Sequence, residues 1–392
     1  MHEVDVAGVL RSVQAQGLRR SVPHMTCSAP RAIHAWFPML IGMVTAIAST
    51  RATASGSERS GRELFEATCV ACHGVDGRGG AAVASAYPLA PPDFTDCNFA
   101  TREPDSDWIA VTHQGGPARG FNRVMPALGE LLTRDELQRV ITYVRRFCTD
   151  RSWPRGELNL PRAQVTSKAY PEDEAAVRVI VGDAEITTRL VYARRVGARN
   201  QLEVVAPLVF VEEMPGDWTG GVGDLAVSAK RVLAHDLGIG SIVSGAVEVV
   251  TPTGNSRRGI GGGSLVFEGY VAYGQLLPAR GFLQLQLGAG IPYDRDHADA
   301  VFARGAIGRR FVQGFGRVWS PMIEVLGARE LIDGARTQVD ALPQLQVTLS
   351  ARQHIVANVG VRLPVNDREG RGSQVLVYLI WDWFDGGFLE GW

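Results

Sequence analysis

The chain has 392 residues, 45% of them hydrophobic, and a formal net charge of −1 at pH 7. This length leaves room for more than one domain, and the near-neutral charge gives no reason to expect a nucleic-acid partner. Lys168 and Lys230 are the only lysines, a bias that we attribute to coding preference rather than to function.

Residues 1–54 predict a cleaved export signal. The apolar run of residues 35–49 has the length of a signal h-region, and Ala52-Thr53-Ala54 offers the small residues of a cleavage site. The run is shorter than the roughly 20 apolar residues of a membrane-spanning helix. Because the leader before the run is unusually long and charged, Met25 is the better candidate for the true start.

The segment Cys69-Val70-Ala71-Cys72-His73 carries the strongest chemical signal in the chain. It follows a predicted helix whose first turn has the capping-box pair Ser60 and Glu63. Cys-x-x-Cys-His is the spacing at which a c-type haem is attached, with both thiols as thioethers and the histidine as the proximal iron ligand. We therefore expect one covalent haem c on Cys69, Cys72 and His73.

Two other chemistries use a Cys-x-x-Cys pair. A thioredoxin-type redox pair would follow a strand of a βαβ unit, whereas a helix is expected here. A zinc site would need further ligands, for which Cys97, His113 and Cys148 are the candidates.

Met125 is the candidate for the second axial ligand, because it is the only methionine between the motif and the end of this domain. Pro126 stiffens the loop that carries it, and a thioether ligand raises the reduction potential. The alternative is that Met125 only fills a gap in the core. His113 is the second candidate for the axial ligand. Methionine and histidine together leave no iron position open for oxygen chemistry, so we expect an electron carrier rather than an enzyme.

Removal of the signal would also remove Cys27 and leave four cysteines, an even number. In an oxidising compartment we expect Cys97 and Cys148, the two outside the haem motif, to form a disulfide. The alternative is a pair of buried free thiols.

A further helix is expected between Thr133 and Phe147. Thr133 and Glu136 have the spacing of a capping box, and apolar residues then recur every three or four positions. With this helix, the Cys-x-x-Cys-His motif and the loop Met125-Pro126-Ala127-Leu128, the region resembles the class I cytochrome c family. The resemblance covers under a quarter of the chain and implies a small all-α domain, residues 55–150, in which this helix packs over the first.

Residues 151–173 are rich in proline and charge and lack periodicity, which we interpret as a linker of restricted flexibility. From residue 174 to residue 392, strict alternation of apolar and polar residues predicts an all-β antiparallel barrel of about 12 strands. Most of these strands have the roughly nine to eleven residues that a tilted strand needs to cross a bilayer. The predicted strands are 174–181, 186–196, 200–212, 222–234, 239–251, 264–276, 281–291, 298–311, 315–328, 337–350, 353–363 and 373–384.

The connections between these strands alternate between tight turns and longer polar loops. This asymmetry is typical of outer-membrane barrels, and an even strand number places both termini on the periplasmic side. The alternative is a soluble β-sandwich or propeller. The segment Gly221-Val222-Gly223-Asp224 resembles a strand of a diverse group of outer-membrane barrels.

A cytochrome followed by such a barrel resembles the fused cytochrome-porin proteins, some of which oxidise extracellular ferrous iron. The resemblance is architectural, and members with that activity have a shorter cytochrome segment and a larger barrel, so we do not transfer the activity. We expect one-electron transfer between a periplasmic redox protein and the outer membrane, or an extracellular donor or acceptor, in a Gram-negative bacterium. The alternative is a small-molecule channel or membrane anchor whose cytochrome domain is only a periplasmic electron acceptor.

Overall fold

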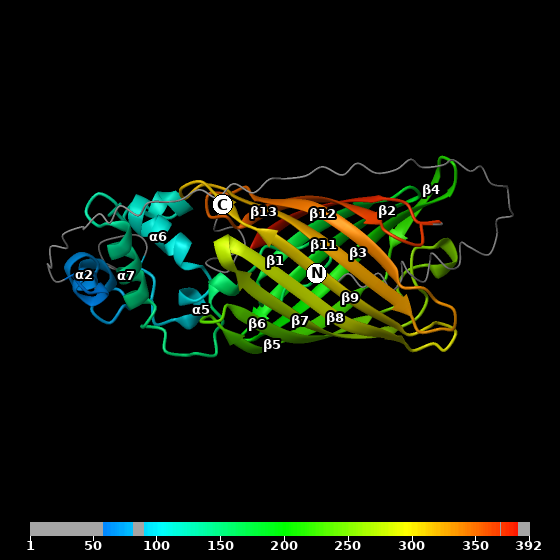
Figure 1. The fold of residues 1–392 in the computed structure, drawn as a ribbon, viewed down its shortest axis with the longest axis horizontal. Helices are drawn as coiled ribbons and strands as arrows, with labels where there is room; N and C mark the ends of the chain where they lie inside the picture. Colours follow the sequence, from blue (N-terminus) through cyan, green and yellow to red (C-terminus); the bar gives the residue numbers. More distant parts are fainter. Residues whose placement is uncertain (1–57, 81–89, 369, 383–392) are drawn as a thin grey trace, which may run out of the picture.

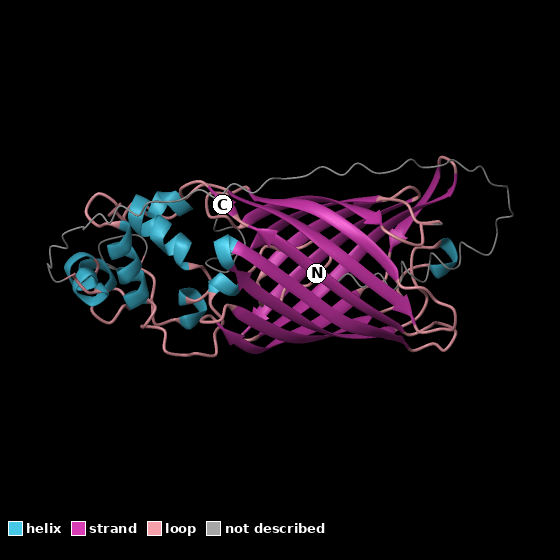
Figure 2. Cartoon of the chain, viewed as in Figure 1, coloured by secondary structure: helices cyan, strands magenta, loops and turns pink. Residues whose placement is uncertain are grey.

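The computed structural model describes residues 58–80, 90–368 and 370–382. A small helical domain sits at one end of an elongated β-barrel (Figure 1), and Figure 2 shows the strands in the barrel and most of the helices in the other part. The expected fold class, an all-α domain followed by an antiparallel barrel of about 12 strands, is confirmed. The predicted export signal, residues 1–54, lies outside the described residues.

Two helices form the centre of the helical domain, α2 (Gly61–Thr68) and α7 (Arg134–Val144). Each begins with the capping box expected from the sequence, in which the Ser60 and Thr133 side chains accept hydrogen bonds from the backbone three residues later. The two helices cross so closely that a Cβ atom at Gly61 would lie 2.1 Å from the carbonyl oxygen of Arg139. Only glycine fits this crossing.

The structure describes five further helical elements ahead of the barrel. They are α3 (Val70–His73), α5 (Cys97–Ala100), α6 (Asp105–Gln114), the 3₁₀ turn η2 (Gly116–Arg119) and the 3₁₀ turn η3 (Gly156–Leu158). Asp105 and Asp107 occupy the first turn of α6, where the helix dipole stabilises carboxylates. The core of the domain consists of Leu64, Phe65, Cys69, Phe94, Leu128, Leu132, Leu137, Val140 and Val144.

Twelve strands close the barrel, and each pairs with its neighbours in sequence in antiparallel fashion. The seam joins the first strand to the last, with Glu174 opposite Asp382. Two further short strands, β4 (Asp217–Val222) and β10 (Phe311–Val312), pair with β3 and β11 beside this ring. The twelve are β1 (Glu174–Val181), β2 (Glu185–Val196), β3 (Asn200–Met214), β5 (Ala226–Asp236), β6 (Ser241–Val250), β7 (Val266–Leu277), β8 (Gly281–Pro292), β9 (Ala300–Arg309), β11 (Val318–Glu330), β12 (Gln338–Thr348), β13 (Ile355–Pro364) and β14 (Gln374–Asp382).

The barrel has the polarity of a membrane protein, with polar residues inside and apolar residues outside. On β1, for example, the Arg178 side chain is 1% exposed in the lumen, whereas Val177 on the outer face is 44% exposed. A soluble sandwich or propeller would show the reverse, so a lipid-facing outer surface explains the pattern better. In residues 58–80, 90–368 and 370–382, no helix is both long and apolar enough to cross a membrane.

The short and long connections lie at opposite ends of the barrel. Tight turns such as residues 197–199 and 237–240 lie at the end where Glu174 and Asp382 meet the helical domain (Figure 1), and longer loops such as residues 251–265 lie at the other end. One connection at that far end, residues 182–184, is short.

The segment expected to be a linker, residues 151–173, does more than connect the domains, because residues 160–173 fill part of the barrel lumen. All of them are buried. The segment enters the lumen as far as the middle of the barrel, where the backbone N–H of Val165 donates to Glu324. It then returns to the rim at Glu174. We call residues 160–173 the plug. Its backbone is hydrogen-bonded by lumen-facing side chains, which are Gln201, Lys230, Ser244, Gln284, Gln286, Glu324, Gln344 and Tyr378.

The only two lysines of the chain meet at this plug. Lys230 Nζ donates to the carbonyl oxygens of Lys168 (3.0 Å) and Tyr170 (2.9 Å), and Lys168 Nζ donates to Glu172 (2.5 Å) and Asn159 (2.8 Å). A lysine ammonium can serve several acceptors in different directions at once. Both lysines of the chain therefore hold the plug.

The glycine-rich segment at residues 221–224 forms the end of β4 and the start of the connection to β5, instead of lying inside a single strand from residue 222. Asp224 accepts hydrogen bonds from the backbone N–H groups of Gly254 (2.8 Å) and Gly262 (2.6 Å). This aspartate thus fastens the loop of residues 251–265 at the far end of the barrel.

Candidate functional site

The Cys-x-x-Cys-His motif occupies one tight turn at the junction of α2 and α3. The N–H of Cys69 donates to Phe65 O (2.8 Å), and the N–H of His73 donates to Cys69 O (2.9 Å). Helix α2 thereby continues into α3 with a small change of direction at Cys69. Cys69, Cys72 and His73 are consequently held within one turn, as attachment of a single group to all three requires.

His73 is oriented by aromatic packing. Its ring stacks on Phe94 with 4.7 Å between centroids, and Phe94 in turn contacts Trp108 (5.4 Å) and Phe147 (6.5 Å). Burial lowers the pKa of His73, so the neutral imidazole, the form that binds iron, is favoured. Its Nδ1 is buried without a hydrogen-bond partner in the described part of the chain.

The other cysteine chemistries fit the structure less well. Cys97 and Cys148 form a disulfide, so neither can complete a zinc site, whereas Cys69 and Cys72 are free thiols. Burial raises the pKa of the Cys69 thiol, opposite to the lowered pKa of the attacking cysteine in a thioredoxin-type pair. Two unbridged thiols beside a neutral histidine suit haem attachment.

Met125 and His113, the two candidates for the second axial position, lie in different surroundings. Met125 is half-buried, and its carbonyl oxygen accepts a hydrogen bond from Gly116 N–H (3.0 Å), which holds the loop against η2. The His113 ring packs against Phe315 in the connection between β9 and β11, with 5.1 Å between centroids. The contact of His113 with the barrel favours Met125, whose role as a ligand stays a prediction.

The helical domain is fixed to the barrel rim by polar contacts from several of its segments. Arg119 donates to Phe315 O (2.9 Å) while paired with Asp107 (2.8 Å). His354 Nε2, in the turn between β12 and β13, lies 2.9 Å from Glu103 Oε1. These contacts could not be predicted from the sequence, because their partners are 196 and 251 residues apart along the chain.

A second contact set joins the helical domain to the base of the plug. Arg102 forms a buried ion pair with Asp173, and the Asp173 carboxylate also accepts a hydrogen bond from Arg195 N–H (2.8 Å). Arg195 additionally lies over the rings of Trp153 (4.8 Å) and Tyr170 (5.3 Å). The helical domain, the plug and the first strands are therefore interlocked.

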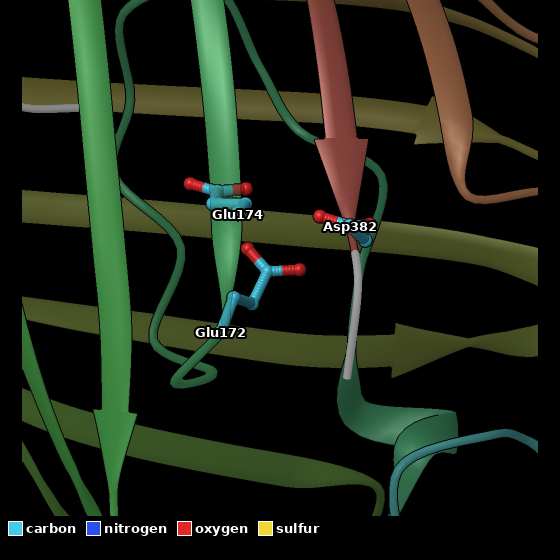
Figure 3. Close-up of side chains that lie close together, drawn as sticks. All are labelled: Glu172, Glu174 and Asp382. Atoms are coloured by element: carbon cyan, nitrogen blue, oxygen red, sulfur yellow. The ribbon is translucent and has the colours of Figure 1, made fainter. Parts of the chain in front are cut away.

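Three carboxylates converge at the barrel seam, and oxygen ligands of this kind can hold a metal ion. Figure 3 shows Glu172, Glu174 and Asp382 with their carboxylates turned toward one another. Arg162, however, forms an ion pair with Glu174 and lies 3.6 Å from Glu172, and Lys168 also pairs with Glu172. Because these cations already neutralise much of the negative charge, we interpret the group as a structural ion-pair cluster.

Residues 56–144 match the family model described as "Cytochrome C oxidase, cbb3-type, subunit III". The match spans the Cys-x-x-Cys-His motif, both capping boxes and Met125, and it covers under a quarter of the chain. Beyond it lies the closed barrel of twelve strands. The chain joins a domain that matches a c-type cytochrome model to a closed antiparallel β-barrel of twelve strands. The helical domain is accordingly called the cytochrome domain below.

Several solved structures are similar to the barrel part. The KdgM porin is 10% identical, with a TM-score of 0.38, over 54% of this chain and 99% of that one. The NanC porin is 10% identical, with a TM-score of 0.38, over 54% and 98%. An outer membrane channel from Pseudomonas putida F1 is 14% identical, with a TM-score of 0.40, over 57% and 100%. No curated protein sequence is similar to the chain.

Proposed function

We propose that the protein is a one-electron carrier whose haem is held at the periplasmic mouth of a closed outer-membrane barrel. The observation that carries the proposal is the docking of the Cys-x-x-Cys-His domain onto the rim through Arg119, Glu103 and Arg102. A diffusing carrier would not need these contacts. They favour a redox centre kept at the membrane.

The residues of the motif suit one haem c. Cys69 and Cys72 would hold it through thioethers, and His73 and Met125 would be the axial ligands. When bound, the haem supplies a reversible one-electron couple, and a methionine ligand favours a high reduction potential. The protein's part is to fix the imidazole by its stacking on Phe94 and to line the surroundings with apolar side chains.

The plug distinguishes this function from the alternative of a small-molecule channel. Residues 160–173 are buried in the lumen, and the tip of the plug at Val165 packs with Ile180, Leu326, Leu342 and Leu376 in an apolar layer. Water and ions cross such a layer poorly. The barrel is therefore better suited as an anchor than as a pore.

The plug in the lumen also limits the route that electrons can take. One haem at the rim cannot by itself span a hydrocarbon core of about 30 Å. A lumen filled by the plug also leaves little room for a second, diffusing carrier. We therefore propose that the short-turn end of the barrel faces the periplasm and that the haem exchanges electrons with a periplasmic redox protein.

Reduction of the haem in intact cells tests the proposal. A membrane-impermeant electron donor is added outside, and the haem absorbance is followed before and after the outer membrane is permeabilised. We expect reduction only after permeabilisation. Rapid reduction in intact cells would show that electrons cross the outer membrane, and it would refute an exclusively periplasmic exchange.

A further inference from the structure

A cleft of about 680 Å³ lies at the barrel rim that carries the cytochrome domain. It is formed by the β7–β8 turn η5 (Pro278–Arg280) and by the connection from β9 to β11. Its lining includes four arginines and two aromatic residues, which are Arg280, Arg309, Arg310, Arg317, Phe311 and Trp319. No aspartate or glutamate belongs to this lining, whose residues are all described.

Arg280, Arg309 and Arg317 leave the positive charge of this cleft unbalanced, whereas the buried Arg310 interacts electrostatically with Asp107 and Glu157. Within the part of the chain that the structure describes, none of the four arginines forms an ion pair. Arg309 lies over the ring of Phe311 (5.1 Å), and Arg310 donates to the carbonyl oxygen of Asn159 (2.6 Å). The three guanidinium groups of Arg280, Arg309 and Arg317 around one cleft repel one another, and a bound anion would relieve that repulsion.

The walls of the cleft are also held in place before any ligand arrives. The backbone N–H of Arg310 donates to Arg280 O (3.0 Å), which ties the two connections together. On the opposite wall, Phe311 and Trp319 are direct partners between β10 and β11. An anion would therefore meet a preformed site.

The cleft lies where the lipid-facing surface of the barrel ends. Trp319 is 47% exposed and continues the outward-facing row of Ile323 and Val325 on β11. Arg309 ends the corresponding row on β9, which includes Val301 and Ile307. Tryptophan at a strand end and arginine just beyond the apolar band are placed at the depth of lipid headgroups.

We propose that this cleft binds the phosphate of an anionic phospholipid in the periplasmic leaflet. Guanidinium groups bind phosphate with paired, charge-assisted hydrogen bonds. The acyl chains of the same lipid would lie along Ile307 and Ile323 on the outer face. A free phosphate ion would use the same guanidinium groups but would gain nothing from this adjoining apolar surface.

Native mass spectrometry of the full-length haem-loaded protein tests this site. The protein is released from micelles containing equal amounts of phosphatidylglycerol and phosphatidylethanolamine, and the two lipid adducts are compared. We expect the wild type to retain phosphatidylglycerol preferentially. The double variant Arg280→Gln/Arg317→Gln should lower that preference about threefold to tenfold, and Arg280→Lys/Arg317→Lys should lower it less.

The matched control is Arg146→Gln/Arg231→Gln, which removes two exposed arginines, one after α7 and one toward the same end of the barrel, neither of which lines the cleft. It should keep the wild-type preference. An equal loss in the control, or no preference in the wild type, would overturn the proposal. Displacement of the lipid by millimolar inorganic phosphate in the wild type would instead show a site for the free ion and would also overturn it.

Discussion

At the scale of single residues, the four cysteines of the described chain divide into two pairs with different roles. Cys97 and Cys148 join the start of α5 to the segment after α7 across 51 residues, and a loop of that length makes a disulfide contribute roughly 4 kcal/mol to stability. Cys69 and Cys72 are three residues apart and remain free thiols. The structural cross-link thus leaves the motif available for a cofactor.

Met125→Ala tests the second axial ligand. If Met125 ligates the iron, the variant loses the absorbance band characteristic of methionine ligation and its reduction potential falls, because the soft thioether favours the reduced iron. Spectroscopy and redox titration of the purified full-length protein measure both effects.

Two matched variants make that result specific. Met214→Ala removes an exposed methionine at the end of β3, and His113→Ala removes the other candidate, which packs against Phe315. Both should keep the band. An unchanged band in Met125→Ala would refute the assignment, and its loss in His113→Ala would favour the histidine.

At the scale of elements, prediction from sequence succeeded where the pattern is local. Helices α2 and α7 were predictable because their capping boxes and apolar faces lie within a few consecutive residues. The barrel strands were predictable because each alternates between lumen and lipid along its own length. The plug was not, since its backbone hydrogen bonds go to side chains on strands far away in sequence. A proline-rich sequence without periodicity has the same pattern in an exposed linker as in a segment buried inside a barrel.

The residues of the candidate site likewise divide into those that could be predicted from the sequence and those that could not. Cys69, Cys72 and His73 could be identified because their chemistry depends on spacing alone. The docking residues could not, because Arg119 and Phe315 meet only after the barrel has closed. The role of Lys230 could not be identified either, because it meets the plug carbonyls only in the closed barrel.

The cap of α7 should give the stability of the cytochrome domain a pH dependence. Hydrogen bonds from Thr133 and Arg59 lower the pKa of Glu136 to about 2. Because this folded value is below the ordinary one, ionised Glu136 stabilises the fold above about pH 4.5. That contribution is lost as the pH falls from about 4.5 toward 2.

Glu136→Gln should therefore lower the melting temperature of the cytochrome domain at neutral pH and flatten its decline between pH 4.5 and pH 2. Thermal unfolding followed at the haem absorbance measures both. Glu130→Gln, an exposed residue before the cap, serves as the control. A variant with the same acid profile as the wild type would contradict this role of Glu136.

The plug can be tested through Lys230, whose buried ammonium donates to two plug carbonyls. Lys230→Met removes these donors and leaves the carbonyls of Lys168 and Tyr170 unpaired, at a cost of about 1–3 kcal/mol each. We expect the variant to conduct ions in planar lipid bilayers, whereas the wild type should be closed. Arg231→Gln, on the outer face beside it, should stay closed. Steady open-pore conductance of the wild type would contradict the closed barrel.

At the scale of the whole molecule, the chain consists of the cytochrome domain, the plug and the barrel, and each of these three parts contacts the other two. The cytochrome domain meets the strand connections through Phe315 and His354 and meets the plug through Asp173. The plug in turn is bound by strands from most of the barrel wall. Movement of the cytochrome domain therefore requires breaking contacts with both of the other parts, which makes its position at the rim a property of the complete chain.

Docking at the rim can be separated from folding of the cytochrome domain by Arg119→Ala/His354→Ala. Each substitution removes a contact between the two parts, and the loss of about 1–2 kcal/mol should speed amide hydrogen exchange at the rim about tenfold. We expect this change at residues 311–317 and 349–354, with an unaltered haem spectrum. Glu66→Ala breaks only the exposed pair with Arg62 on α2 and should leave exchange at the rim unchanged. If the double variant exchanges like the wild type, the plug contact of Arg102 with Asp173 is sufficient to hold the domain, and Arg102→Ala becomes the variant that must release it.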